Sequence, residues 1–539
     1  MKFEENEVMF PPPGRTPRED TDAVMKFYKL PKTFPQDVLE EAKHVVDKLK
    51  DPGRRLDLRK KFIFTCDPAT AKDFDDALSL ETDRKGNRVL GVHIADVSHF
   101  VRPGSALDRE AYKRSTSVYF ADRVVPMLPE ALSNGVCSLV PGEERLAFSV
   151  FVTFDKKGEA VKRSFAKSVI RSKARFAYEE VMKIIAGGSP RDLYDSGRAS
   201  SLMEAKRMAK TIREISELAQ QLRAARFAAG ALDIEIPEAE AILDEGGDLA
   251  GLVTRPYDES HQMIEECMVA ANEAVAKELW TKGVKILARL HEPPEDEKIE
   301  MLRAELKGLG VKCGNIANQK VFAQLLQTIK KNPLYPTLAV MVLRSMKRAV
   351  YDSRNMGHFG LAKRFYAHFT SPIRRYPDLT LHRQLADFLA GGAPKARVDA
   401  HRLAKWAEHA SEMEDVAANA ERGLMEIKKF RLLEDQLATR QIVDYDAVVS
   451  KCTPFGCFVE IPELAASGLV HVSLLSQKFV RFNESDRTLS APGRSWRVGD
   501  RMRVHVAKVD FRQRRLDFVP VETEQKHRKG ARRWTSRYS

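Results

Sequence analysis

Apolar and polar positions alternate around an acidic stretch near the start of the chain, FIFTCDPATAKDFDDALSLE, residues 62–81. Phe62 and Phe64 alternate with smaller or polar residues, and residues 77–80 are mostly apolar. Pro68 and the small residues after it suit a tight loop. The pattern predicts a short strand, an acidic loop and a second strand.

Further apolar runs predict more strands in the first half of the chain. Leu90–Val101 is an apolar-rich strand candidate, and Phe148–Phe154 is another that Asp155–Gly158 closes as a turn. The stretch GALDIEIPE, which begins at Gly230, is also expected to be a strand.

Helical spacing dominates other segments. Residues 179–227 are rich in Ala, Leu, Met, Lys and Arg, and residues 255–272 read as a turn followed by a helix that carries Glu265 and Glu266. Residues 402–432 give the clearest helix, because apolar residues recur in steps of three and four. That stripe indicates core or interdomain packing rather than a cofactor site. Residues 32–50 have weaker helical spacing.

The pattern changes again from about residue 440. Short apolar segments such as DAVVSKCTPFGCFVEI and VGDRMRVHVAKVD alternate with Gly and Pro turns. This spacing is typical of a small β-barrel.

Composition narrows the class of protein. With 539 residues, 43% of them hydrophobic, the chain can form more than one domain with a sizeable core. Its net charge of +13 favours a polyanionic partner, although basic proteins with no such partner are common. The six cysteines form no CxxC pair, which argues against a zinc ribbon or a disulfide framework. We find no secretory signal and no apolar run long enough for a membrane span, so we expect a cytoplasmic protein without a membrane partner.

Four aspartates lie within ten residues of the acidic loop: Asp67, Asp73, Asp75 and Asp76. Carboxylates held so close raise one another's pKa unless a cation lies between them. Oxygen ligands without His or Cys suit a hard ion such as Mg²⁺, and two such ions about 3.5–4 Å apart can promote attack on a phosphodiester. A solvated acidic turn is the alternative, and the physics of the loop leaves both readings open.

Other polar positions also allow two readings. Arg374 and Arg375 in HFTSPIRRYPDL could hold phosphate oxygens or lie on a surface turn. The aromatic pair Tyr119 and Phe120 could face a ligand, but such a pair more often belongs to the core. A further set, His93, Asp96 and His99, could bind a metal, but hydrogen-bonded polar residues beside a buried sheet are at least as good a reading.

The D-x5-D-x-D-D pattern within CDPATAKDFDDA, together with SPIRRYPDL, resembles the RNB family of exoribonucleases, which includes ribonucleases II and R. The resemblance implies that the four aspartates bind magnesium, with Asp75 and Arg374 catalytic. It assigns Arg374 to the scissile phosphate, Arg375 to RNA contact and Tyr119 to stacking on the 3′-terminal base. Related enzymes place a stacking phenylalanine where this chain has Ala288.

The segments after residue 440 resemble an S1 module, a five-stranded OB barrel. The resemblance implies that three groups stack on or contact RNA there: Phe455, Phe458 and His471. The alternative is that the phenylalanines belong to the barrel core, and we expect this for one of the two. Nearby basic residues would contact the backbone: Lys451, Arg501 and Arg503. Aromatic groups over a basic face hold single strands without sequence choice.

We therefore expect an α+β architecture, with an RNB catalytic domain of mixed sheet, surrounding helices and a central RNA channel, followed by an S1 barrel. The expected divisions are an N-terminal extension or linker (1–50), the RNB domain (51–438), the S1 domain (439–521) and a basic disordered tail (522–539). The Pro-rich start is expected to be extended, and we expect none of the cold-shock modules usual in ribonuclease R within this sequence.

The resemblance implies a processive 3′→5′ exoribonuclease that hydrolyses single-stranded RNA to nucleoside 5′-monophosphates with two Mg²⁺, for which Mn²⁺ is a candidate substitute. We expect a monomer whose partner is the 3′ end of RNA, with the ribosome or RNA quality-control factors as candidate partners. The alternative is a non-catalytic RNA-binding regulator on the same scaffold.

Overall fold

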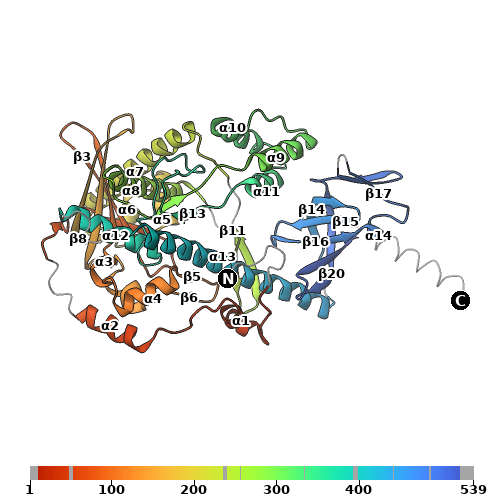
Figure 1. Ribbon diagram of the computed structural model, residues 1–539, viewed down its shortest axis with the longest axis horizontal. Helices are drawn as coiled ribbons and strands as arrows, with labels where there is room; N and C mark the ends of the chain where they lie inside the picture. The colour runs from red at the N-terminus through yellow and green to blue at the C-terminus, as the bar shows by residue number, and fades with distance from the viewer. Residues whose placement is uncertain are drawn as a thin grey trace, which may run out of the picture.

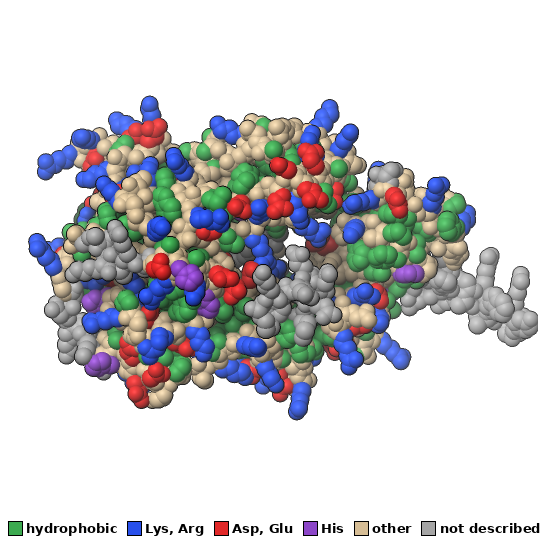
Figure 2. All heavy atoms as spheres, viewed as in Figure 1, with side chains coloured by type: hydrophobic (Ala, Val, Ile, Leu, Met, Phe, Trp, Pro, Cys, Tyr) green, Lys and Arg blue, Asp and Glu red, His purple; other side chains and the backbone are tan. Residues whose placement is uncertain are grey.

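The computed structural model describes residues 10–47, 53–234, 239–254, 257–332, 334–391, 399–440, 442–484 and 487–521. A large body of sheet and helices lies on one side and a small barrel on the other, and the long helix α13 (Ala400–Ala438) runs from the first toward the second (Figure 1). Basic side chains are spread over both bodies (Figure 2). The predicted tail, residues 522–539, lies outside the described residues.

The large body is built on a mixed sheet of seven strands in the order β1-β8-β7-β4-β3-β2-β9. Neighbours are antiparallel except for the β1–β8 and β2–β9 pairs. The strands are β1 (Leu56–Asp57), β2 (Phe64–Asp67), β3 (Asp76–Thr82), β4 (Arg88–Ala95), β7 (Glu144–Phe154), β8 (Ala160–Arg171) and β9 (Ala174–Ala177). The predicted strand, acidic loop and strand are thus confirmed as β2, the loop and β3.

Two strand predictions need correction. The strand expected over Leu90–Val101 ends at Ala95, because Asp96 then begins the short helix α3 (Val97–Phe100). The strand expected from Gly230 is wrong for residues 231–234, which form neither helix nor strand, and β10 starts only at Ala239. Residues 235–238 lie outside the described part.

Helices cover both faces of the sheet. One face packs on α5 (Tyr178–Ile185), α6 (Pro190–Asp195), α7 (Leu202–Ala228) and α8 (Glu259–Thr281), with Phe148, Ile94 and Met263 in the shared core. These elements confirm the helical reading of residues 179–227 and 255–272. The other face packs on α2 (Gln36–Asp47), α3, α4 (Ala106–Arg114), the π-helical turn η2 (Ala131–Val136) and α12 (Tyr376–Leu389).

Smaller elements complete the large body. Helices α9 (Asp296–Gly308), α10 (Gln319–Ile329) and α11 (Tyr335–Ser345) share a separate hydrophobic core. Three two-stranded sheets pair β5 (Val118–Tyr119) with β6 (Val124–Val125), β10 (Ala239–Leu243) with β11 (Leu249–Thr254), and β12 (Ala288–Leu290) with β13 (Val350–Asp352).

The small body confirms the predicted barrel. It closes in the order β14-β15-β16-β21-β20 and carries a three-stranded sheet, β17-β18-β19. Its elements are β14 (Tyr445–Thr453), β15 (Gly456–Ile461), β16 (Ala466–His471), α14 (Val472–Leu475), β17 (Arg481–Asn483), β18 (Thr488–Ala491), β19 (Arg494–Trp496), β20 (Arg501–Asp510) and β21 (Arg515–Pro520). Phe430 and Leu433 of α13 belong to the barrel's core cluster, so the helix predicted from periodicity is an interdomain element.

The His93, Asp96 and His99 set is structural. His93 is buried between the hydroxyls of Ser79 and Ser149, at 2.9 and 2.7 Å. Burial opposes ionisation of Asp96, but Lys167 and Arg55 outweigh it and lower the pKa of Asp96 to about 2. The hydrogen-bonded reading of this set is confirmed.

The N-terminal segment is anchored to α13. Residues 10–16 have no helix or strand, and they lead into η1 (Pro17–Glu19) and α1 (Asp20–Phe27). Asp20 is fully buried and pairs with Lys428 at 2.9 Å and with Arg431 at 2.8 Å. Across the described residues, no helix is long and apolar enough to cross a membrane.

We predict that Asp20→Asn will lower the free energy of unfolding by about 3–5 kcal/mol, because it leaves the buried Lys428 ammonium without its charge partner. Denaturant unfolding and limited proteolysis near α1 measure the effect. The matched control is Asp22→Asn, whose carboxylate pairs with Lys32 and Arg123 at the surface and should contribute less than about 1 kcal/mol. Equal effects of the two substitutions would contradict the anchoring role of Asp20.

Candidate active site and RNA interface

The acidic loop joins the ends of two paired strands. Asp67 is the last residue of β2 and Asp76 the first of β3, and Phe64 lies opposite Leu78 in the register between them. Asp67 and Asp76 therefore lie at the same end of the sheet, with Asp73 and Asp75 in the connection. The hairpin topology thus places the four aspartates at one end of the sheet.

Side chains from outside the loop fix its backbone. The Arg175 guanidinium donates to the carbonyl oxygens of Pro68 and Ala69, both at 2.7 Å. The buried Ser138 hydroxyl donates to the carbonyl of Lys72 at 2.8 Å and accepts from the backbone N–H of Phe74 at 3.0 Å. A simple solvated turn would not need these partners, so the structure argues against that alternative.

Asp75 is the most enclosed carboxylate of the loop, with 5% of its surface exposed. Its Oδ1 accepts a hydrogen bond of 2.9 Å from the backbone N–H of Ile373. Burial raises the pKa of Asp75 well above its usual value, while the nearby Arg374 charge acts in the opposite direction. Asp75 thus links the acidic loop directly to the segment that carries Arg374.

The surroundings of Asp67 and Asp76 disfavour their ionised forms. Burial and the neighbouring charge of Asp76 raise the pKa of Asp67 to about 8, and burial raises the pKa of Asp76 to about 6 against Arg374 and Arg375. Within the described chain, the buried Oδ2 of Asp67 has no hydrogen-bond partner. Desolvated carboxylate oxygens that lack a partner are a donor set that fits a hard divalent cation.

The carboxylates do not converge on one point. In the part of the chain that the structure covers, no three His, Cys, Asp or Glu side chains are arranged to hold a metal ion. Asp73 accepts a hydrogen bond from Tyr119, and Asp75 accepts one from Ile373, which turns two of the four groups toward protein donors. The assignment of Asp67, Asp73, Asp75 and Asp76 as metal ligands therefore stays a prediction.

Two distant segments pair beside the loop. The backbone N–H of Ser117 donates to the carbonyl of Arg374 at 3.0 Å, and that of Tyr376 donates to the carbonyl of Ser115 at 2.8 Å. This pairing places Tyr119 and Arg374 next to the aspartates. No local sequence pattern indicates it, because the two segments are far apart along the chain.

Tyr119 is partly open to solvent, whereas Phe120 is buried. Tyr119 is 40% exposed, and Phe120 is 7% exposed in the core of α1 and α13. The Tyr119 hydroxyl donates to Asp73 Oδ2 at 3.2 Å, and its backbone N–H donates to Glu421 Oε1 of α13 at 2.8 Å. Sequence reasoning missed Glu421, because nothing in the polar face of α13 singles it out.

The two arginines differ. Arg374 is exposed and donates to the Ser371 hydroxyl at 3.2 Å. Arg375 donates two hydrogen bonds of 2.9 Å to the fully buried Asp378. The Asp378 carboxylate also accepts from the Ser371 backbone, so Arg375 helps to shape the turn. RNA contact by Arg375 stays a prediction.

The barrel candidates lie around the β14–β15 turn. Phe455 is half exposed and makes an edge-to-face contact of 6.0 Å with Phe458, which is partly exposed. The expectation that one of them is a core residue is wrong, since neither belongs to the buried cluster of the barrel. His471 begins α14 and accepts from the Ser473 backbone N–H.

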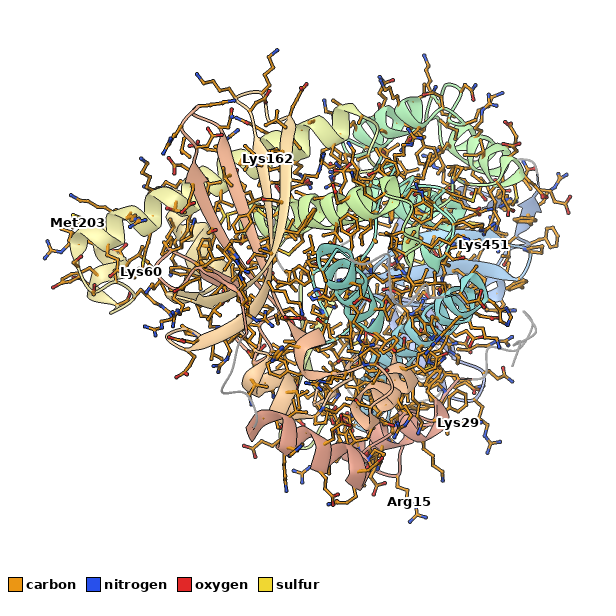
Figure 3. The ribbon with its side chains drawn as sticks, turned by 60° about the vertical axis from the view of Figure 1, so that its left-hand side comes forward. Arg15, Lys29, Lys60, Lys162, Met203 and Lys451 are labelled. Atoms are coloured by element: carbon orange, nitrogen blue, oxygen red, sulfur yellow. The ribbon has the colours of Figure 1, made fainter. Side chains whose placement is uncertain are left out.

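The basic candidates of the barrel are all exposed: Lys451, Arg501 and Arg503. Arg503 pairs with Asp444 at 3.1 Å. Figure 3 shows Lys451 on the barrel and Lys162 on the large body.

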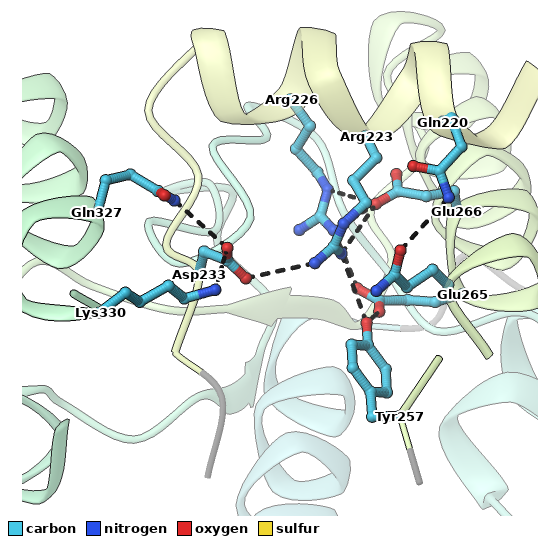
Figure 4. Close-up of polar contacts among 10 residues, drawn as sticks. Gln220, Arg223, Arg226, Asp233, Tyr257, Glu265, Glu266, Gln327 and Lys330 are labelled. Atoms are coloured by element: carbon cyan, nitrogen blue, oxygen red, sulfur yellow. Dashed lines mark hydrogen bonds and ion pairs between the residues drawn. The ribbon is translucent and has the colours of Figure 1, made fainter. Parts of the chain in front are cut away.

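A polar network ties the α9–α11 cluster to α7 and α8 (Figure 4). The buried Arg226 donates to Glu265 and Glu266, each at 3.0 Å. Asp233 accepts from Gln327 at 3.3 Å and also pairs with Arg223 at 3.3 Å. Glu265 and Glu266 thus have ion-pair partners, which agrees with leaving them out of the catalytic set.

Comparisons with known proteins agree with this arrangement. Residues 55–391 match the RNB domain family, and residues 444–519 match the S1 RNA binding domain family. Ribonuclease R of Thermotoga maritima is 40% identical over 96% of this chain and 74% of its own length, and that of Aquifex aeolicus is 37% identical over 94% and 71%. The structure is similar to Mycoplasma genitalium RNase R in complex with ribose methylated single-stranded RNA, with a TM-score of 0.84 and 28% identity over 94% of this chain and 78% of that one.

We predict that Mg²⁺ affinity will rise between pH 6 and pH 8. Because the pKa of Asp67 is raised to about 8, the group holds a proton below that pH, and the cation must displace the proton. For one displaced proton the affinity changes by at most about tenfold per pH unit. Calorimetric titration with Mg²⁺ in buffers of different ionisation enthalpy measures the affinity and the number of protons displaced. Asp67→Asn should flatten the pH dependence, and an unchanged slope in that variant would contradict the assignment.

Proposed function

Because the chain belongs to the RNB family and is a hydrolytic 3′→5′ exoribonuclease of the ribonuclease R type, we propose that it degrades single-stranded RNA processively to nucleoside 5′-monophosphates. The observation that carries the proposal is the position of exposed Arg374 and Tyr119 beside the desolvated carboxylates of the acidic loop. One small region thus contains a ring that can stack on a base, a guanidinium that can bind a phosphate, and carboxylates that can bind a metal.

The metal is the first part of the proposal. The family is metal-dependent, and Asp67, Asp73, Asp75 and Asp76 would hold Mg²⁺, two ions being expected and Mn²⁺ a candidate substitute. Bound there, the cations would supply an activated water and neutralise the leaving oxygen. The Asp67 oxygen without a hydrogen-bond partner supports this assignment.

The protein's own groups position the substrate. The exposed Arg374 guanidinium would donate to the scissile phosphate and stabilise the charge that builds on it. The half-open ring of Tyr119 would stack on the terminal base, because its hydroxyl and backbone are held by Asp73 and Glu421. Burial of Asp75 leaves only 5% of its surface open to solvent.

The chain binds RNA, and we assign the grip on the strand to the barrel. Phe455, Phe458 and His471 would stack on bases, while Lys451, Arg501 and Arg503 would contact phosphates. The 3′ end would thread from there through a channel to the aspartates. We further propose a monomer acting in the cytoplasm, with the ribosome or RNA quality-control factors as candidate partners.

A non-catalytic RNA-binding regulator on this scaffold is the second candidate function. A regulator does not need the acidic loop, yet the chain keeps all four aspartates with Arg374 and fixes them through Arg175, Ser138 and Ile373. The arrangement favours the enzyme. A time course on 5′-labelled single-stranded RNA, with and without Mg²⁺, separates the two functions.

We predict that Asp75→Asn will lower the rate of hydrolysis at least about 100-fold while RNA affinity stays within a factor of two or so, since the change removes one of the carboxylates proposed to hold the cations. Single-turnover hydrolysis and filter binding measure the two effects. Asp83→Asn, at the far end of β3 in an exposed turn, is the control and should leave hydrolysis unchanged. Parallel loss of binding and hydrolysis in Asp75→Asn would exclude a purely chemical role.

We predict that Tyr119→Ala will lengthen the limit product, because the loss of a stacking group worth about 1–3 kcal/mol releases short remnants earlier. Gel analysis of end products measures the change. Tyr119→Phe keeps the ring and loses only the hydroxyl that donates to Asp73, so its product should match that of the unmodified protein. An unchanged product in Tyr119→Ala would remove Tyr119 from the clamp.

We predict that changing Lys451, Arg501 and Arg503 together to Gln will reduce the salt dependence of RNA binding, since each lost phosphate contact lowers the slope of log K against log salt by about 0.7. The control changes Arg84, Lys85 and Lys162, exposed basic residues of the large body, and should leave the slope unaltered. Equal slopes for both triple variants would rule out the barrel as the site of phosphate contact.

A further inference from the structure

An aromatic side chain on the barrel stands almost free of the protein. Phe479 lies between α14 and β17 and is 86% exposed, the largest exposed fraction among the large hydrophobic residues of the described chain. Phe455, already assigned to RNA, is 50% exposed. A ring this exposed is available to stack on a base of a nucleic acid.

The direction of Phe479 follows from alternation along the chain. Val480 and Phe482 pack against the barrel core, so Phe479 and Arg481 face outward. Arg481 lies opposite Ser490 in the β17–β18 pair, and Ser490 lies opposite Ser495 in the β18–β19 pair. The outer face of this three-stranded sheet therefore carries an exposed ring, a cation and two exposed hydroxyls.

The exposed ring is connected to the barrel face assigned to RNA. The backbone N–H of Val472, at the start of α14, donates to the carbonyl of Phe455 at 2.9 Å. One turn of helix and four further residues lead to Phe479, which spans at most about 20 Å. That distance corresponds to about six stacked nucleotides at 3.4 Å each. A single strand on Phe455 can thus reach Phe479.

Charge favours a nucleic acid at this position. Residues 472–483 contain Lys478 and Arg481 and no acidic residue, and Glu484 follows at the end of β17. In Figure 2, hydrophobic side chains gather on the visible face of the barrel with Lys and Arg around them. An aromatic ring between two cations is a usual arrangement for stacking a base and pairing the adjacent phosphates.

We propose that Phe479 and the outer face of β17-β18-β19 form a second stacking site, which binds a base of the RNA strand that the Phe455 face holds, with Lys478 and Arg481 on its phosphates. The site rests on the proposed exoribonuclease function and extends it, because it lengthens the strand that the enzyme holds during degradation. Ser490 and Ser495 present hydroxyls for the sugar or phosphate oxygens.

The test measures RNA affinity by fluorescence anisotropy in an Asp75→Asn background, where the RNA stays intact. Phe479→Ala should weaken binding of an RNA of about 30 nucleotides at least fivefold, and of one of about 3 nucleotides much less, because the short strand cannot occupy both sites. Phe479→Trp should restore the affinity for the long RNA. Thermal unfolding should be unchanged, since the ring is exposed.

Met203→Ala is the matched control, because Met203 is 81% exposed on α7 of the large body and should have no effect on RNA binding. Unchanged affinity of Phe479→Ala for the long RNA would overturn the proposal. It would favour a protein, rather than RNA, as the partner that contacts the Phe479 ring. Hydrolysis of short RNA by the unmodified protein separates this result from failure of the proposed function, since hydrolysis would persist if only the second site were absent.

Discussion

The desolvation of a few carboxylates is the constraint on which the rest of the structure depends. Burial raises the pKa of Asp67, Asp75 and Asp76. Interactions with fixed partners must offset the free-energy cost of this burial. Arg175 and Ser138 hold the loop backbone, and the Ile373 N–H holds Asp75 itself. The large body thus holds these carboxylates in a desolvated site at one end of the sheet.

The fold of the large body also determines which side chains lie beside the carboxylates. The pairing of residues 115–117 with 374–376 brings a ring and a guanidinium to the loop from two remote segments. Glu421 then fixes the backbone of Tyr119 from a third element, α13. Because three segments meet only in the folded chain, the proposed binding of a strand end and the proposed chemistry at its phosphate both depend on tertiary structure.

Local pattern predicted much of this arrangement. Alternation located β2 and β3, steps of three and four located α13, and the spacing of the aspartates located the acidic loop. Pattern could not identify Arg175, Ser138 or Glu421, because each acts through a partner remote in sequence. It also could not distinguish Arg374 from Arg375, since only the fold shows that Asp378 binds the second guanidinium. The prediction of a core phenylalanine in the barrel failed because Phe455 lies in the turn and Phe458 alternates on β15 with the buried Cys457 and Val459.

The helix α13 has a consequence of its own. Its 39 residues rise about 1.5 Å each, so it spans about 58 Å without a break. Glu421 contacts Tyr119 partway along it, and Phe430 and Leu433 enter the barrel core about three turns later. A continuous helix keeps these two contacts at a fixed separation. If the barrel binds the strand and the acidic loop cleaves it, as proposed, this separation sets the shortest RNA that can contact both.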